Sequence, residues 1–258
     1  MKQHLLDKVL WLGDPPPPPP RRWFHLGRNW HLGKYRPHGI PVRELAERSS
    51  ASSEFRQECS VILKTVPDNL RAMLSEFGLM VQPTWDIFET IEFSDYYGPR
   101  GHGDRFTWPR VSGLCRNQGH VVVLCEYVVL NERRQKAENR QGVFNHELGH
   151  SFDAACDYIS QKEEFLARVK QDTERIHQAL PPSLSSVLHY FLAEAPQGPS
   201  EIFAECFAAC LGVCAVKYWT EDMKSWFPKS YEMVERLVAL PPHELRKLMR
   251  SATALPPQ

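Results

Sequence analysis

Apolar residues recur at helical spacing near the start of the globular part of the chain. The series is Val61, Ile62, Leu63, Val66, Leu70, Met73, Leu74 and Phe77. Apolar positions three and four apart are typical of one buried helix face. Pro67 and Asp68 predict a helix start, and Gly78 predicts its end. Residues 79–81 and 85–93 favour strands, and residues 97–104 form a predicted loop.

The clearest strand signal runs from residue 121 to residue 129. Its nearly unbroken apolar character predicts a strand that is buried on both faces. A polar loop over residues 131–141 is expected next. A strand at the edge of a sheet can bind an extended peptide by backbone pairing, and the pattern leaves open whether residues 121–129 form such an edge.

The second half of the chain is mainly helical in pattern. Apolar residues interleaved with charges predict an amphipathic helix over residues 163–180, which Pro181 and Pro182 end. A short helix is expected within 184–192. Gly198-Pro199-Ser200 predicts the start of another, strongly apolar helix. The elements together predict the α+β class.

Composition suggests how the chain is divided into segments and which classes of binding partner are expected. Residues 1–54 read as a flexible proline-rich arm, residues 55–250 as one domain and residues 251–258 as a tail. Pro15 to Pro20 predict a polyproline II rod, which serves as a spacer or as the ligand of a groove-type partner. Lys plus Arg and Asp plus Glu both number 31, so charge gives no reason to expect a nucleic-acid partner.

Compartment is inferred from apolar runs and cysteines. No run approaches the roughly 20 residues of a membrane span. Asp7 and Lys8 interrupt the apolar residues near the N-terminus, and no small-residue cleavage site follows, so no secretory signal is predicted. Seven cysteines without paired spacing fit buried free thiols in a reducing compartment. We therefore expect a cytoplasmic protein, or one exported by a signal-independent route.

The most informative stretch is His146-Glu147-Leu148-Gly149-His150. Residues four apart lie on one helix face, so both imidazoles can bind the same metal ion while Glu147 projects beside it. A catalytic zinc usually has three protein ligands and a water whose pKa falls to about 7. Glu147 would be the base that takes the proton of this water. Apolar flanking residues predict a buried helix, on which a metal would satisfy both histidines.

Two carboxylates interrupt the apolar helix that begins near Ser200. Glu201 and Glu205 are four apart and share a face. Buried carboxylates repel each other and resist desolvation unless they meet cations. A zinc ion with its histidines would supply the positive charge.

The chain resembles the zinc peptidases that include the catalytic domain of anthrax lethal factor and the proline-proline endopeptidases. The resemblance covers about residues 59–211 and is carried by three segments, which are residues 107–113, 145–153 and 200–205. It implies a zincin-like domain, with a small mixed sheet packed on the H-E-x-x-H helix and one Zn²⁺ per chain. His146, His150 and Glu201 would be the ligands and Glu147 the base. Glu205 would orient a ligand histidine. Asp153 is expected to lie just outside the metal ligands and to support their orientation.

One role of the family transfers poorly. The family has an oxyanion-donating tyrosine seven residues before the ligand glutamate, but position 194 is Glu194. Tyr190, one helical turn earlier, either takes this role or packs in the core beside Phe191.

Cysteines offer other possible ligands. The metzincin pattern requires Gly at 153 and His at 156, where the chain has Asp153 and Cys156. Cys156 could bind zinc, yet Glu201 with Glu205 explains more residues. Cys206, Cys210 and Cys214 follow helical spacing in an apolar setting, which favours core thiols.

These features predict a gluzincin-type zinc endopeptidase that hydrolyses a protein or peptide substrate. Zinc would polarise the scissile carbonyl, Glu147 would move the proton, and Tyr190 or a nearby group would donate to the oxyanion. The alternative is a catalytically silent zinc-binding domain that recognises a protein partner through the same groove. An adaptor acting through the segment Pro15 to Pro20 is a third interpretation.

Overall fold

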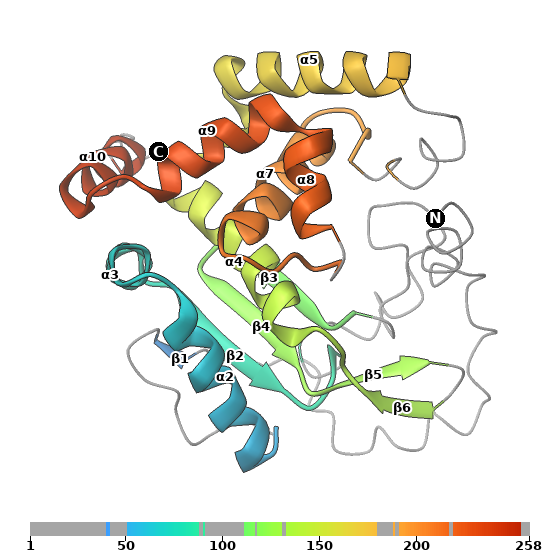
Figure 1. Cartoon of the computed structure of the whole chain (residues 1–258). Coiled ribbons are helices and arrows are strands. Elements are labelled where there is room, and N and C mark those ends of the chain that lie inside the picture. Colours follow the sequence, from blue (N-terminus) through green and yellow to red (C-terminus); the bar gives the residue numbers. More distant parts are fainter. Residues whose placement is uncertain are drawn as a thin grey trace.

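Helix α4 (Arg140–Ala155) lies between a sheet and the carboxy-terminal helices (Figure 1). The computed structural model describes residues 40–41, 51–87, 90, 111–116, 118–130, 133–179, 188, 191–216 and 219–253. Before α4 come α2 (Ser53–Thr65) and α3 (Asp68–Phe77). After it come η6 (Ile159–Gln161), α5 (Glu163–Ala179), α7 (Gln197–Cys210), α8 (Thr220–Trp226), α9 (Pro228–Val238) and α10 (Pro242–Thr253). The α+β class predicted from sequence is confirmed.

The main sheet is mixed and has the strand order β1-β2-β4-β3. Its strands are β1 (Ile40–Pro41), β2 (Met80–Thr84), β4 (Val121–Cys125) and β3 (Gly113–Arg116). β2 and β4 are parallel, whereas β1 pairs antiparallel with β2 and β3 antiparallel with β4. A separate hairpin joins β5 (Tyr127–Leu130) to β6 (Arg133–Lys136). β3 therefore ends the strand order and β4 lies inside the sheet.

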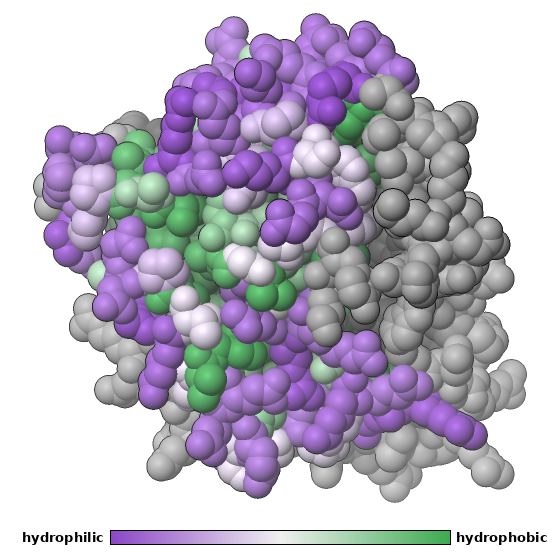
Figure 2. Space-filling model, in the orientation of Figure 1, coloured by the Kyte–Doolittle hydropathy of each residue, from purple (hydrophilic) through white to green (hydrophobic). Residues whose placement is uncertain are grey.

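The predicted helices over residues 61–77 form as expected. The hydroxyl of Ser52 caps α2 by accepting from Phe55 N at 3.1 Å. α2 stops at Thr65, since a residue directly before proline disfavours helix. Gly78 ends α3 in the left-handed region, with φ 85°, which is favourable for glycine. The amphipathic helix α5 also forms as predicted, and Figure 2 shows that its outer surface is hydrophilic.

β4 is buried on both faces, as its sequence predicted. Val122 and Leu124 join the main core on the side of α4. Val121 and Val123 pack on the other side in a smaller cluster. Alternate residues of a strand point to opposite faces, so one five-residue strand connects two cores.

The prediction of one continuous strand over residues 121–129 is wrong. The segment divides at Glu126 into β4 and β5, which belong to different sheets. The Glu126 carboxylate accepts from Ser52 N and Ser52 Oγ, both at 2.8 Å. A buried carboxylate needs such donors. Glu126 N still donates to Thr84 O of β2 at 2.9 Å, and the hairpin of β5 and β6 begins at the next residue.

Two neighbouring predictions also need correction. Trp85 and Asp86 form a bend instead of a strand, and Thr90 N donates to Ile87 O at 2.9 Å in a turn. The buried Asp86 pairs with Arg134 at 2.9 Å, which draws the chain towards β6. The expected loop over residues 131–141 in turn contains β6 and the start of α4.

Several predicted features fall partly outside the described residues. Pro15 to Pro20, the loop 97–104 and most of the short helix expected within 184–192 lie there. Ile40 and Pro41, within the predicted arm, pair with β2. α2 begins ahead of residue 55, and α10 enters the predicted tail. The three-part division of the chain stays a prediction. Within the described ranges, no helix has the length and apolar character needed to cross a bilayer.

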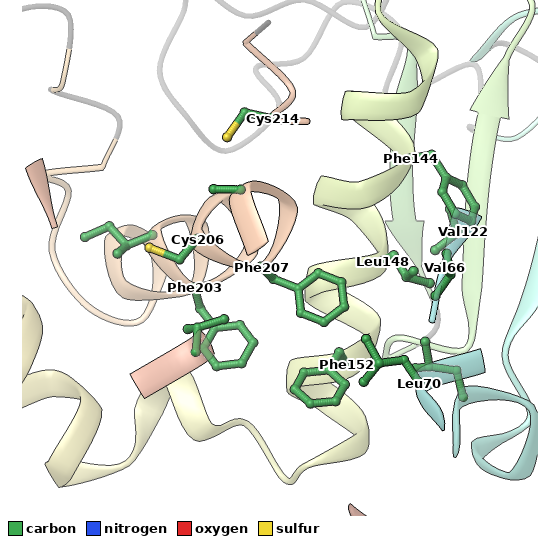
Figure 3. Close-up of a cluster of buried hydrophobic side chains, with 14 of the residues drawn as sticks. Val66, Leu70, Val122, Phe144, Leu148, Phe152, Phe203, Cys206, Phe207 and Cys214 are labelled. Atoms are coloured by element: carbon green, nitrogen blue, oxygen red, sulfur yellow. The ribbon is translucent and has the colours of Figure 1, made fainter. Parts of the chain in front are cut away.

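α4 and α7 cross at close range around a small-residue contact. A Cβ built on Gly149 would lie 2.7 Å from Ala204 Cα and 2.8 Å from Ala204 O. Below this contact, Phe152 of α4 meets Phe207 of α7, with ring centroids 5.0 Å apart (Figure 3). The absent side chain at residue 149 therefore sets how near the two helices come.

The seven cysteines are free thiols. Cys115 and Cys210 are half-buried, and the other five are buried. Burial raises the pKa of four thiols to about 12, namely those of Cys59, Cys115, Cys156 and Cys210. A raised pKa lowers the fraction of reactive thiolate at neutral pH.

Replacing Gly149 with Ala is expected to destabilise the protein by about 1–3 kcal/mol, as overpacking does. Helix propensity alone would favour alanine by up to about 1 kcal/mol. The sign of the change in the free energy of unfolding therefore tells which of the two effects is larger. The test is urea unfolding, with Gln171→Ala on the exposed face of α5 as the control. A Gly149→Ala variant as stable as this control would contradict the close crossing.

The cysteines should react slowly in the folded protein. Raising a thiol pKa from 9.0 to about 12 lowers the thiolate fraction at pH 8 by roughly 10³-fold, before any effect of access. Labelling with a chromogenic disulfide, with and without urea, measures this difference. Rapid modification of Cys59 or Cys156 in the folded protein would show that those positions are more open than described.

Candidate metal centre

His146 and His150 project from the same face of α4, one turn apart. Their ring centroids are 4.9 Å apart and the rings are nearly perpendicular, at 87°. The helix is otherwise largely buried, with Phe144, Leu148 and Phe152 packed in the core. The apolar packing fixes the rotation of α4, so both imidazoles face α7.

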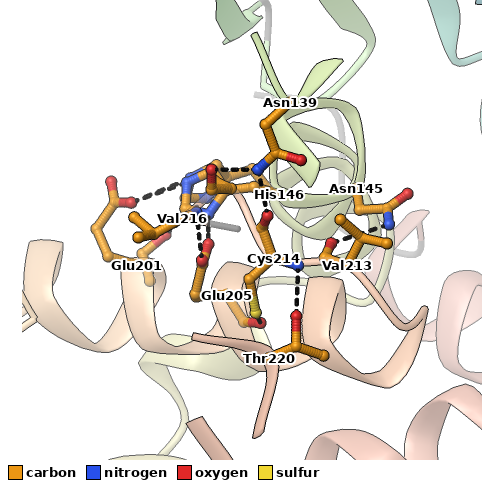
Figure 4. A network of polar contacts seen from close by, with 12 residues as sticks. Asn139, Asn145, His146, Glu201, Glu205, Val213, Cys214, Val216 and Thr220 are labelled. Carbon is orange, nitrogen blue, oxygen red and sulfur yellow. Dashed lines mark hydrogen bonds and ion pairs between the residues drawn. The ribbon is translucent and has the colours of Figure 1, made fainter. Parts of the chain in front are cut away.

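α7 supplies the Glu201 carboxylate, which points towards the His146 ring (Figure 4). Glu201 Oε2 lies 3.1 Å from His146 Nε2 and 3.6 Å from His150 Nε2. Among the residues that the structure describes, these three form the group that could hold a metal ion, with ligand atoms within 4.8 Å of one another. Two imidazole nitrogens and one glutamate oxygen are a donor set of catalytic zinc sites. The residues therefore fit Zn²⁺.

The other nitrogen of each ring is also engaged. His146 Nδ1 donates to Glu205 Oε2 at 2.6 Å. His150 Nδ1 lies 3.3 Å from Ser200 Oγ. Contacts of this kind select the tautomer and orient the ring, leaving Nε2 for the metal. Sequence reasoning missed Ser200 in this role, although its place directly before Glu201 was a usable signal.

The electrostatics of the cluster favour a positive charge between the helices. Burial alone would lower the pKa of His146, but Glu201 and Glu205 outweigh it and raise that pKa well above its ordinary value. Burial would raise the pKa of Glu201, but His150 and His146 hold it well below the usual range. The carboxylates thus stabilise a cation at the rings, whether a proton or a metal ion.

Glu147 lies beside the two histidines and is buried, at 8% exposure. The edge strand β3 approaches it closely. A Cβ on Gly113 would lie 3.1 Å from Glu147 Cγ and 2.4 Å from Val143 Cγ1. Cys115, two residues along the same strand, contacts Ser151 of α4 at 3.4 Å. A glycine within a strand often marks such a close approach, and here it admits the Glu147 side chain.

Asp153 is engaged at the carboxy-terminal end of α4. Its carboxylate accepts from Ser160 N at 2.8 Å and from Ser160 Oγ at 2.5 Å. Burial raises the pKa of Asp153, although these bonds and His150 partly offset the effect. Asp153 therefore holds the turn into η6, and its expected support of the ligands stays a prediction.

The remaining candidates are Tyr190 and Cys156. Tyr190 lies outside the described residues. Glu194, at the family's tyrosine position, is exposed, and its carbonyl accepts from Gln197 N and Gly198 N before α7. Cys156 is buried at 4% exposure and is not among the three converging ligands. The oxyanion donor thus remains unassigned by the described residues.

Comparison with known proteins gives matches among solved structures. No family model matches the chain, and no curated protein matches it. The chain is similar to the PRO-PRO endopeptidase PPEP-2 from Paenibacillus alvei, with 19% identity and a TM-score of 0.45 over 73% of this chain and 95% of that one.

Proposed function

We propose that this protein is a zinc-dependent endopeptidase of the gluzincin type, built on a zincin-like domain. The proposal is carried by one observation, which is the convergence of His146, His150 and Glu201 beside the buried Glu147. When bound by the three ligands, Zn²⁺ would polarise a scissile carbonyl and lower the pKa of a water to about 7. The substrate is a protein or peptide.

Glu147 is proposed as the general base. It follows His146 directly on α4, so its carboxylate would lie beside the reacting water, accept its proton and pass it to the leaving amine. The approach of Gly113 shields one side of Glu147 from solvent. Tyr190 or a nearby group is the proposed oxyanion donor, because Tyr190 lies one helical turn before the position at which the resemblance expects a tyrosine.

The edge strand β3 is the proposed platform for the substrate. It ends the strand order, so its outer edge has no strand partner among the described residues. Gly113, the first residue of β3, contacts Glu147, which places this edge beside the base. An extended peptide pairing with the edge through backbone hydrogen bonds would carry its scissile bond to the site.

The zinc site is tested by metal analysis of ligand variants. The protein is expected to bind close to one Zn²⁺ per chain, and His146→Ala or His150→Ala should weaken binding by orders of magnitude. Glu201→Gln should weaken it more than Glu205→Gln, whose loss of orientation typically costs about 10–100-fold. His177→Ala, an exposed histidine on α5, is the control. Unchanged zinc content in a His146→Ala, His150→Ala double variant would place the metal elsewhere.

The enzymatic role is tested at Glu147. Glu147→Gln should retain zinc and fold but lower peptide hydrolysis by at least ~10²-fold, because the variant lacks the proton acceptor. The measurement is cleavage of a broad peptide library by both forms at equal zinc loading. Equal rates would remove Glu147 from the mechanism. A wild-type protein that binds zinc but cleaves no peptide would instead favour the silent binding domain.

A further inference from the structure

The chain that leaves α7 turns back across the amino end of α4, and asparagine side chains hold it there (Figure 4). We call residues 213–216 the return segment. Asn139 Nδ2 donates to Cys214 O at 2.8 Å and to Ala215 O at 2.6 Å. Asn145 Nδ2 donates to Val213 O at 3.1 Å. Three successive carbonyls of the return segment are therefore bound by amides that belong to α4 or precede it.

The position of Asn139 is unusual for a residue that begins a helix. An asparagine at this position commonly uses its side-chain oxygen to cap the first turn. Asn139 makes no such capping bond, and its backbone is left-handed, with φ 47°. Its amide is directed to the return segment instead. The contact is close, since a Cβ on Gly142 would lie 1.9 Å from Cys214 O.

The return segment ends on the carboxylate behind the metal site. Val216 N donates to Glu205 Oε1 at 3.3 Å, while Glu205 Oε2 accepts from His146 Nδ1 at 2.6 Å. The terminal torsion of a glutamate is broad, so a carboxylate held at one oxygen can rotate. Holding both oxygens fixes its plane. Glu205 is 1% exposed, so water does not substitute for these partners.

We propose that Asn139 is a positioning residue for the metal site. It fixes the return segment, which holds Glu205, which in turn orients the His146 ring towards its partner ligands. The inference rests on the proposed zinc site and adds a residue that does not contact the ligands itself. The path runs from the start of α4, through the chain after α7, and back to α4.

The test is the zinc affinity of Asn139→Gly, measured by competition with a chromophoric chelator. Glycine keeps the left-handed backbone and costs a helix start only a few tenths of a kcal/mol, so the change removes mainly the amide. Gln118→Gly is the matched control, because Gln118 is exposed and also left-handed, with φ 55°. Asn139→Gly should bind zinc about 10–100-fold more weakly, and Gln118→Gly should match the wild type. Wild-type affinity in Asn139→Gly, even with lowered thermal stability, would overturn the proposal.

A double-mutant cycle with Glu205→Gln identifies the path. If Asn139 acts through Glu205, the double variant should bind zinc no more weakly than Glu205→Gln alone. Losses that add would overturn the proposed path. Failure of the zinc site itself is distinguishable, since His146→Ala would then bind zinc as the wild type does.

Discussion

The structure depends on the close crossing of α4 and α7. With no side chain at Gly149, the α4 backbone comes within van der Waals distance of Ala204. Because the helices lie this close, the side chains of the histidines on α4 can contact those of the glutamates on α7. The contacts between the site residues therefore depend on the packing of small and aromatic residues between α4 and α7.

The crossing brings charges together that would be costly alone. Removing one partner from a buried ion pair typically costs 3–5 kcal/mol, because the other charge is left uncompensated. His146 contacts both Glu201 and Glu205. The carboxylates raise the pKa of the His146 ring, and the histidines in turn lower the pKa of Glu201. Because desolvation offsets much of the attraction between its charges, such a cluster contributes little net stability when it is intact. The free-energy cost appears when one of the partners is removed.

Local patterns predicted the helices and the residues of the cluster. Spacing placed His146 and His150 on one face, and Gly198 with Pro199 marked the helix that carries Glu201. The division of the long apolar strand at Glu126 could not be predicted in the same way. The donors to the buried Glu126 carboxylate lie at Ser52, which is distant in sequence. Asn139 was missed for the same reason, because its partners are carbonyls of Cys214 and Ala215, which no periodicity relates to the start of α4.

The bond between Ser52 and Glu126 bears on where a shortened form of the protein can begin. A chain starting at residue 55, the boundary that composition suggested, would lack both donors to a carboxylate that is 4% exposed. Leaving a buried charged group without its donors costs upwards of about 1–3 kcal/mol. The loss of these donors would also affect α4, because Arg140 of α4 donates to Glu126 O at 3.0 Å. Ser52 thus belongs to the smallest unit that would keep the candidate metal site in place.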